Sequence, residues 1–153
     1  MIVKNEEKNL ARCLAGMEEL VSEICIVDTG STDATVEVAR TFGATVESMK
    51  WDDDFSRARN HSLEMARAEW ILVLDADEML SSDSFQQIKA AIDGTDICGY
   101  TLPTHNYTRD SSSANYIPND GAFAAAAELP GWVESRKVRL FRNLPGVQFE
   151  GRL

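Results

Sequence analysis

Apolar residues in the first 93 positions fall into short continuous runs that are separated by helical stripes. The runs, which predict buried strands with the last one in the centre of a sheet, lie at residues 1–3, 24–27, 44–49 and 70–74. The stripes, which predict amphipathic helices, lie at residues 5–23, 31–42, 55–67 and 82–92. Four strand–helix units in succession are typical of a mostly parallel sheet with helices on both faces. We therefore expect an α/β fold.

Beyond Gly94 the pattern changes. Two further segments, at residues 97–101 and 137–141, look like strands. The stretch 106–131 between them is polar and rich in small residues, so we expect a long loop there that is either functional or disordered, with a short helix at the alanine run 124–127. The chain starts inside a predicted strand and stops without a turn or cap. We therefore expect a fragment of a longer protein, truncated at its C-terminus.

The composition and net charge of the chain argue against some classes of binding partner. A chain of 153 residues, 44% of them hydrophobic, is large enough for one domain with its own core. The net charge of -10 argues against a nucleic acid or an anionic membrane surface as a direct partner. The widely spaced Cys13, Cys25 and Cys98 favour a reducing cytoplasm over a disulfide framework. The sequence shows no transmembrane segment, so contact with the inner face of a membrane would require a partner or a missing region.

Two carboxylates, Asp75 and Asp77, directly follow the apolar run at residues 70–74. Because side chains alternate along a strand, both are expected on one side at its carboxyl end, where open α/β sheets bind ligands. Hard oxygen ligands suit Mg²⁺ or Mn²⁺ carrying a phosphate-bearing substrate. The alternative is that two acidic residues only end a strand and begin a loop.

Asp28 follows the second predicted strand and is expected at the same edge. Gly30 permits a tight turn there, and a carboxylate at a strand end can accept the N–H of a base. The alternative is that Asp28 only closes the turn. The tetrapeptide at residues 28–31, Asp-Thr-Gly-Ser, also occurs in aspartic proteases, which need two such carboxylates in an all-β fold. The helical pattern that follows it excludes that class.

Four segments together resemble the inverting family 2 glycosyltransferases of the Rossmann-like GT-A fold. They are Ile-Val-Lys-Asn-Glu-Glu, Val-Asp-Thr-Gly-Ser-Thr-Asp, Arg-Asn and Leu-Asp-Ala-Asp-Glu, at residues 2–7, 27–33, 59–60 and 74–78. Residues 51–60 are similar to the branch that includes bacterial lipopolysaccharide-core and peptide-modifying glycosyltransferases. The resemblance implies a nucleotide-sugar-binding half at residues 1–93 and part of the acceptor-side region at residues 94–153.

The resemblance also implies roles for individual residues. Those that match positions near the nucleotide-sugar are Val3, Glu6, Asp28, Arg59, Asn60 and Asp75. Of these, Asp28 matches the carboxylate that bonds the base, commonly uracil, which implies a UDP-sugar. Asp77 matches the direct ligand of the Mg²⁺ or Mn²⁺ that bridges the diphosphate, with Asp75 beside it. Two alternatives remain open: Arg59 could be an ion-pair partner of nearby acids, and Asn60 could bond a neighbouring loop.

The implied reaction transfers a sugar, with inversion, to an acceptor that the sequence does not identify: a saccharide, a lipid-linked saccharide or a peptide. Such a displacement needs a general base. Glu78 is a candidate by position, but relatives place a His-Glu pair shortly after a segment like residues 148–153, so we expect the base to lie beyond this chain. Two alternatives are a nucleotidyltransferase, whose glycine-rich and lysine-bearing start is absent here, and a truncated module that binds nucleotide without turnover.

Overall fold

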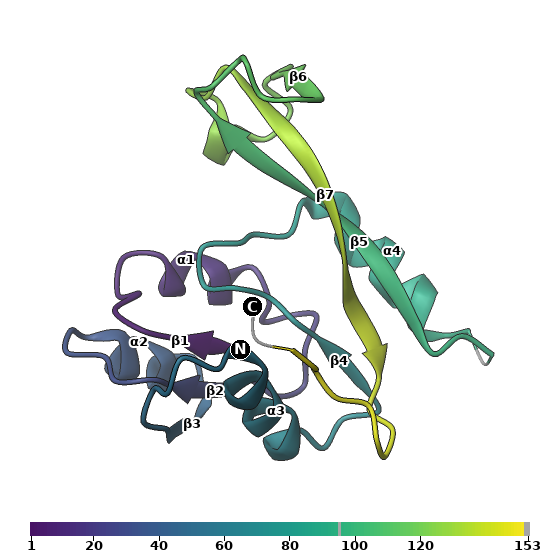
Figure 1. Ribbon diagram of the computed structural model, residues 1–153. Coiled ribbons are helices and arrows are strands. Elements are labelled where there is room, and N and C mark those ends of the chain that lie inside the picture. The colour runs from purple at the N-terminus through teal and green to yellow at the C-terminus, as the bar shows by residue number, and fades with distance from the viewer. Residues whose placement is uncertain (95, 152–153) are drawn as a thin grey trace.

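The computed structural model describes residues 1–94 and 96–151, and its first layer is a parallel sheet (Figure 1). The strands β1 (Ile2–Val3), β2 (Cys25–Asp28) and β3 (Thr45–Ser48) are hydrogen-bonded in the order β1-β2-β3. Val3 pairs with Asp28, and Asp28 pairs with Ser48, so the carboxyl ends of the three strands meet at one edge. The α/β class and its parallel sheet are thus confirmed.

Helices cover both faces of this sheet. The helices α1 (Leu10–Ala15) and α2 (Thr35–Thr41) enclose a core with Ile26 of β2, whose side chain is fully buried. The neighbouring Val27 alternates to the other face, where α3 (Phe55–Met65) packs against β1 and β2. The helix α1 is much shorter than the predicted 5–23. Residues 4–9 form turns that are bonded to the loop after β2, and Gly16 follows the last helical residue.

A second, antiparallel sheet contains the remaining strands. They are β4 (Trp70–Leu72), β5 (Gly99–Thr108), β6 (Tyr116–Pro118) and β7 (Gly131–Arg142), in the order β4-β7-β5 with β6 also paired to β7. The run at residues 70–74 is therefore not the central strand of the parallel sheet: among the described residues its ladder partner is β7, and it ends at Leu72. The helix α4 (Ser82–Ile92) has the predicted bounds.

The strands β5 and β7 are longer than the predicted runs 97–101 and 137–141, and they extend well into the stretch that was expected to be a loop. Along β5, partly buried and exposed residues alternate, which is a strand pattern that a search for continuous apolar runs misses. The two strands form a long arm that projects from the rest of the chain, with β6 and the 3₁₀ turn η1 (Ala124–Ala126) near its tip (Figure 1). The short helix expected at the alanine run is this turn.

A bulge interrupts the pairing of β5 with β7. Tyr100 pairs with Leu140, but the next residue, Thr101, pairs with Val138, so Arg139 has no counterpart on β5. Its carbonyl instead accepts the backbone N–H of Val73 at 2.7 Å, directly after β4. Bulges of this kind redirect a side chain next to functional sites. Here the bulge brings a buried arginine to the segment that contains the predicted metal ligands.

Candidate functional site

Asp28 lies at the end of β2, and its carboxylate closes the turn that follows. It accepts the backbone N–H of Gly30 at 3.2 Å and of Ser31 at 3.1 Å. Gly30 has φ 105°, a left-handed conformation that glycine adopts without strain. The turn-closing role is therefore present in the structure. The contact of Asp28 with a base stays a prediction, and it would use the lone pairs that the turn leaves free.

Hydrogen bonds join the loop after β1 to the loop after β2. The side-chain oxygen of Asn5 accepts the backbone N–H of Thr32 at 2.8 Å, and the backbone N–H of Asn5 donates to the Ser31 hydroxyl at 2.9 Å. The N–H of Glu6 donates to the Thr35 hydroxyl at 2.7 Å. Asn5 has φ 57°, which asparagine tolerates better than most residues. The two loops therefore form one preorganised unit at the edge of the parallel sheet.

Val3 and Glu6, which were predicted to line a nucleotide pocket, have different environments in this unit. The side chain of Val3 is buried in the core, and its carbonyl accepts both the N–H and the hydroxyl of Thr29, at 2.9 and 3.0 Å. Glu6 is partly exposed, and its carboxylate accepts the Asn9 side chain at 2.9 Å. Their contact with a nucleotide stays a prediction. Of Val3 and Glu6, Glu6 has the side chain that reaches the surface.

Asp75 and Asp77 lie in a turn that follows β4, not on the strand itself. The N–H of Glu78 donates to the carbonyl of Asp75 at 3.0 Å and closes this turn. Because β4 ends at Leu72, the strand alternation that would direct both carboxylates to one side does not reach them. Asp75 is partly buried, whereas Asp77 is exposed. Ala76 between them packs in the same core as Val3, which places the turn beside the end of β1.

Two arginines hold the carboxylate of Asp75. Arg139 Nη2 lies 3.1 Å from one oxygen, and Arg59 Nη2 lies 3.4 Å from the other. Burial by itself would raise the pKa of Asp75, but the charge and hydrogen bond of Arg139, with the charge of Arg59, outweigh it and lower this pKa below its ordinary value. Asp75 is therefore ionised at neutral pH. The role of Arg59 as an ion-pair partner is present in the structure, and its contact with a nucleotide-sugar stays a prediction.

Glu78, the candidate base, is bound through both carboxylate oxygens. One lies 2.5 Å from Arg139 Nη2, and the other accepts the backbone N–H of Asp75 at 2.9 Å. Burial raises its pKa, and the neighbouring arginine compensates only in part. These contacts turn the carboxylate inward and fix the turn. Catalysis by Glu78 therefore stays an untested prediction.

The carboxylates fit a divalent cation that arrives with a ligand. Mg²⁺ is typically held by one or two carboxylates, with waters and substrate phosphates completing its coordination. Asp77 supplies an exposed carboxylate, and Asp75 supplies oxygens that it shares with two arginines. Within residues 1–94 and 96–151, no cluster of three acidic, histidine or cysteine side chains could hold a metal alone. The donor set therefore suits Mg²⁺ or Mn²⁺ bound jointly with a phosphate group.

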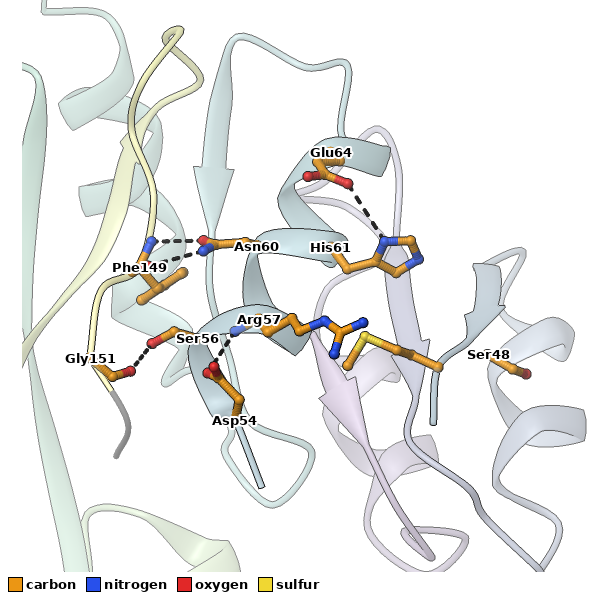
Figure 2. A pocket seen from close by; sticks show the side chains of 10 residues that line it. Ser48, Asp54, Ser56, Arg57, Asn60, His61, Glu64, Phe149 and Gly151 are labelled. Carbon is orange, nitrogen blue, oxygen red and sulfur yellow. Dashed lines mark hydrogen bonds and ion pairs between the residues drawn. The ribbon is translucent and has the colours of Figure 1, made fainter. Parts of the chain in front are cut away.

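Asn60 holds the C-terminal segment against α3 (Figure 2). Its side-chain oxygen accepts the N–H of Phe149 at 2.7 Å, and its amide donates to the carbonyl of Phe149 at 2.9 Å. One turn earlier, the Ser56 hydroxyl donates to the carbonyl of Gly151. The alternative in which Asn60 bonds a neighbouring segment is therefore found. Its contact with a nucleotide-sugar stays a prediction that would compete with these bonds.

Two cavities flank α3. The first has a volume of about 690 Å³ and is lined by Ser48, Met49, Asp54, Ser56, Arg57, Asn60, His61, Glu64, Phe149 and Gly151 (Figure 2). The second has a volume of about 530 Å³ and is lined by Phe55, Arg59, Val73, Lys137, Val138, Arg139 and Phe149. The neighbours Arg59 and Asn60 thus face different cavities, and Phe149 lines both.

Lys137, Arg139 and Phe149 were not among the site residues predicted from the sequence. Their importance depends on contacts between distant segments: Arg139 and Asp75 are 64 residues apart. The available signal was a charged residue, Arg139, between the apolar Val138 and Leu140 of the predicted strand at residues 137–141. A buried arginine in such a strand usually has a carboxylate partner.

An Asn60→Ala variant is expected to release the C-terminal segment without unfolding the rest of the chain. It removes two hydrogen bonds to Phe149, so the free energy of unfolding should fall by about 1–2 kcal/mol. Hydrogen exchange should show faster exchange of the Phe149 amide in particular. Gln87→Ala, on an exposed position of α4, is the control. Unchanged protection of Phe149 in the Asn60→Ala variant would contradict the interpretation.

Comparison with known proteins assigns this arrangement to one family. Residues 1–150 match the family described as "Glycosyl transferase family 2". A TPR repeat-containing protein of Synechococcus elongatus is 35% identical over 150 residues, which cover 98% of this chain and 32% of that protein. The SPbeta prophage-derived glycosyltransferase SunS of Bacillus subtilis is 40% identical over 86 residues, or 55% of this chain and 20% of SunS. The chain thus spans a third or less of these relatives.

Solved structures agree on the fold. A fragment of Staphylococcus aureus TarS superimposes with a TM-score of 0.53 at 22% identity, over 60% of this chain and 30% of the fragment. A second crystal structure, of a mycobacterial protein, gives a TM-score of 0.53 at 22% identity, over 63% of this chain and 37% of that one. Among the described residues, no helix has both the length and the apolar character to cross a membrane.

Proposed function

The chain belongs to glycosyltransferase family 2, and we propose that it is the donor-binding part of an inverting enzyme that uses a nucleotide-sugar and requires Mg²⁺ or Mn²⁺. The observation that carries this proposal is the position of three carboxylates. Asp28 ends β2, and the turn with Asp75 and Asp77 packs beside the end of β1. This edge of an α/β sheet is where ligands usually bind.

Different residues at that edge would bind different parts of the donor. Asp28 would accept the N–H of a base, supported by the bonded loops that contain Glu6. A divalent ion held by Asp75 and Asp77 would supply the positive charge that stabilises the leaving nucleoside diphosphate, in a chain whose net charge is -10. The arginines that hold Asp75 fix the orientation of its carboxylate.

Uridine nucleotides are the first donors to test, since TarS has been crystallised in complex with UDP. At a UDP-sugar concentration of about 100 times Kd, binding adds about 2.7 kcal/mol to stability, which for a domain of this size raises Tm by about 5–10 °C. We expect this rise with Mn²⁺ and a UDP-sugar together, and little of it when EDTA replaces Mn²⁺.

Two results would count against this proposal. No rise in Tm with any nucleotide-sugar, with either ion, would contradict the proposal. Release of pyrophosphate from a nucleoside triphosphate and a sugar phosphate would favour the nucleotidyltransferase alternative. A cytoplasmic location and a saccharide, lipid-linked or peptide acceptor complete the proposal, and neither is needed for this test.

A second candidate is a module that binds nucleotide without turnover. It is favoured by Glu78, whose two carboxylate oxygens are held by Arg139 and by the backbone N–H of Asp75, which gives this residue a structural role in the turn. Donor binding without release of UDP, together with turnover in a longer chain that extends past Leu153, would identify an enzyme whose base lies beyond these residues. Binding without turnover in both chains would support the module.

A further inference from the structure

The second cavity has a charge opposite to that of the whole chain. Its charged lining residues, Arg59, Lys137 and Arg139, are all cations, although the chain has a net charge of -10. They come from α3 and β7, which are far apart in the sequence. The remaining lining is apolar: Phe55, Val73, Val138 and Phe149. Apolar side chains screen the charges of the three cations less than water does.

One donor in this group lacks an acceptor. The side chain of Arg139 is 5% exposed, and its Nε is buried without a hydrogen-bond partner in the part of the chain that the structure describes. Buried donors are normally satisfied, and an unsatisfied one costs about 1–3 kcal/mol. The bulge at Arg139 keeps the guanidinium at this position. An oxygen-rich ligand would supply the missing acceptor.

Lys137 provides a second unmatched charge. It is exposed, and no ion pair or hydrogen bond of its side chain is found within residues 1–94 and 96–151. Arg59 and Arg139 share Asp75, and Arg139 also contacts Glu78. Three cations thus meet two carboxylates, so one positive charge remains. The excess favours an anion.

We propose that Arg59, Lys137 and Arg139 form a subsite for a phosphate group in the cavity beside Asp75. Guanidinium groups bind phosphate through paired N–H donors, and lysine adds a mobile point charge. The source of the phosphate rests on the proposed function: it is either the diphosphate of the donor or a phosphate on the acceptor. The apolar rim would contact the part of the ligand that carries this phosphate.

The direct test uses inorganic phosphate and the metal-free chain, with calorimetry at low ionic strength. We expect binding that is about tenfold weaker in Lys137→Gln, and also about tenfold weaker in Arg139→Lys, which keeps the charge but removes the paired donors. Lys89→Gln, at an exposed position of α4, removes the same charge elsewhere and should bind as the wild type does. Absence of phosphate binding, or an equal loss in Lys89→Gln, would overturn the subsite.

Competition then identifies the source. If UDP with Mn²⁺ displaces inorganic phosphate, the subsite serves the donor diphosphate; if both bind together, it serves an acceptor phosphate. Either result supports the subsite. Intact binding of UDP with Mn²⁺ in a chain that does not bind phosphate would refute the subsite and leave the proposed function standing. Phosphate binding that Lys137→Gln weakens, without any nucleotide binding, would do the reverse.

Discussion

An Asp77→Ala variant is expected to bind a UDP-sugar in the presence of Mn²⁺ at least about 100-fold more weakly than the wild type. Loss of a residue that only supports a metal ligand already weakens metal sites by about 10- to 100-fold, and Asp77 is the exposed carboxylate of this turn. The Tm with Mn²⁺ should therefore equal the Tm with EDTA. The Tm of the unliganded variant should change little, because Asp77 is exposed and no hydrogen bond or ion pair of its side chain is found within the described residues.

The matched control is Glu128→Ala. Glu128 is an exposed carboxylate beside η1 at the far end of the arm, so its loss changes the net charge equally without touching the turn. A variant at Asp77 that keeps the full Mn²⁺-dependent rise in Tm would remove Asp77 from the metal site. An equal loss in Glu128→Ala would point to net charge as the cause.

Replacing Arg139 with methionine is expected to lower the free energy of unfolding by about 2–3 kcal/mol. The variant leaves the carboxylates of Asp75 and Glu78 without their shared partner. Breaking a fully buried ion pair costs about 3–5 kcal/mol, and a smaller value applies here because the Asp75 side chain is 33% exposed. The urea midpoint should fall by about 1–2 M with an unchanged slope.

The pH dependence of this loss has a definite sign. The pKa of Asp75 is lowered in the folded state, so its pairing stabilises the fold above the ordinary pKa of about 4 and is lost as pH falls through the lowered value. The raised pKa of Glu78 acts in the other direction, since its ionised form is disfavoured in the folded state. The difference between wild type and Arg139→Met should therefore be largest near neutral pH and shrink in acid.

Arg136→Met is the control for this series, because Arg136 is exposed on the same strand and pairs with Glu134 at the surface. It should change stability by less than about 1 kcal/mol. If Arg139→Met is no more destabilising than Arg136→Met, the buried network contributes little, and Asp75 must be held by other contacts. Unfolding in urea at several pH values measures both variants.

The sequence was sufficient for the parts of the fold that depend on local patterns. The run at residues 24–27 and the stripe at residues 55–67 were recognisable because their apolar spacing is complete within a few residues. The pairing of β4 with β7 could not be predicted in this way, because no residue near position 70 indicates which strand will be its partner. The arm was missed for a similar reason: much of β5 has an exposed face and no continuous apolar run.

The candidate site divides in the same way. Asp28 and Asp77 could be proposed from motifs, since each follows a strand-like run. The ion pairs of Asp75 with two arginines could not be predicted, because Arg139 reaches Asp75 through a bulge that depends on the register of β5 and β7. The hydrogen bonds between Asn60 and Phe149 could not be predicted either, because they join positions 89 residues apart.

Phe149 has a consequence for any ligand that enters this region. Its ring lies 5.5 Å from the guanidinium carbon of Arg59, and the residue lines both cavities beside α3. The segment that Asn60 and Ser56 hold is therefore a partition between two spaces, one reaching the end of β3 and the other reaching the buried arginine of β7. Withdrawal of this segment would therefore remove the wall that the two spaces share.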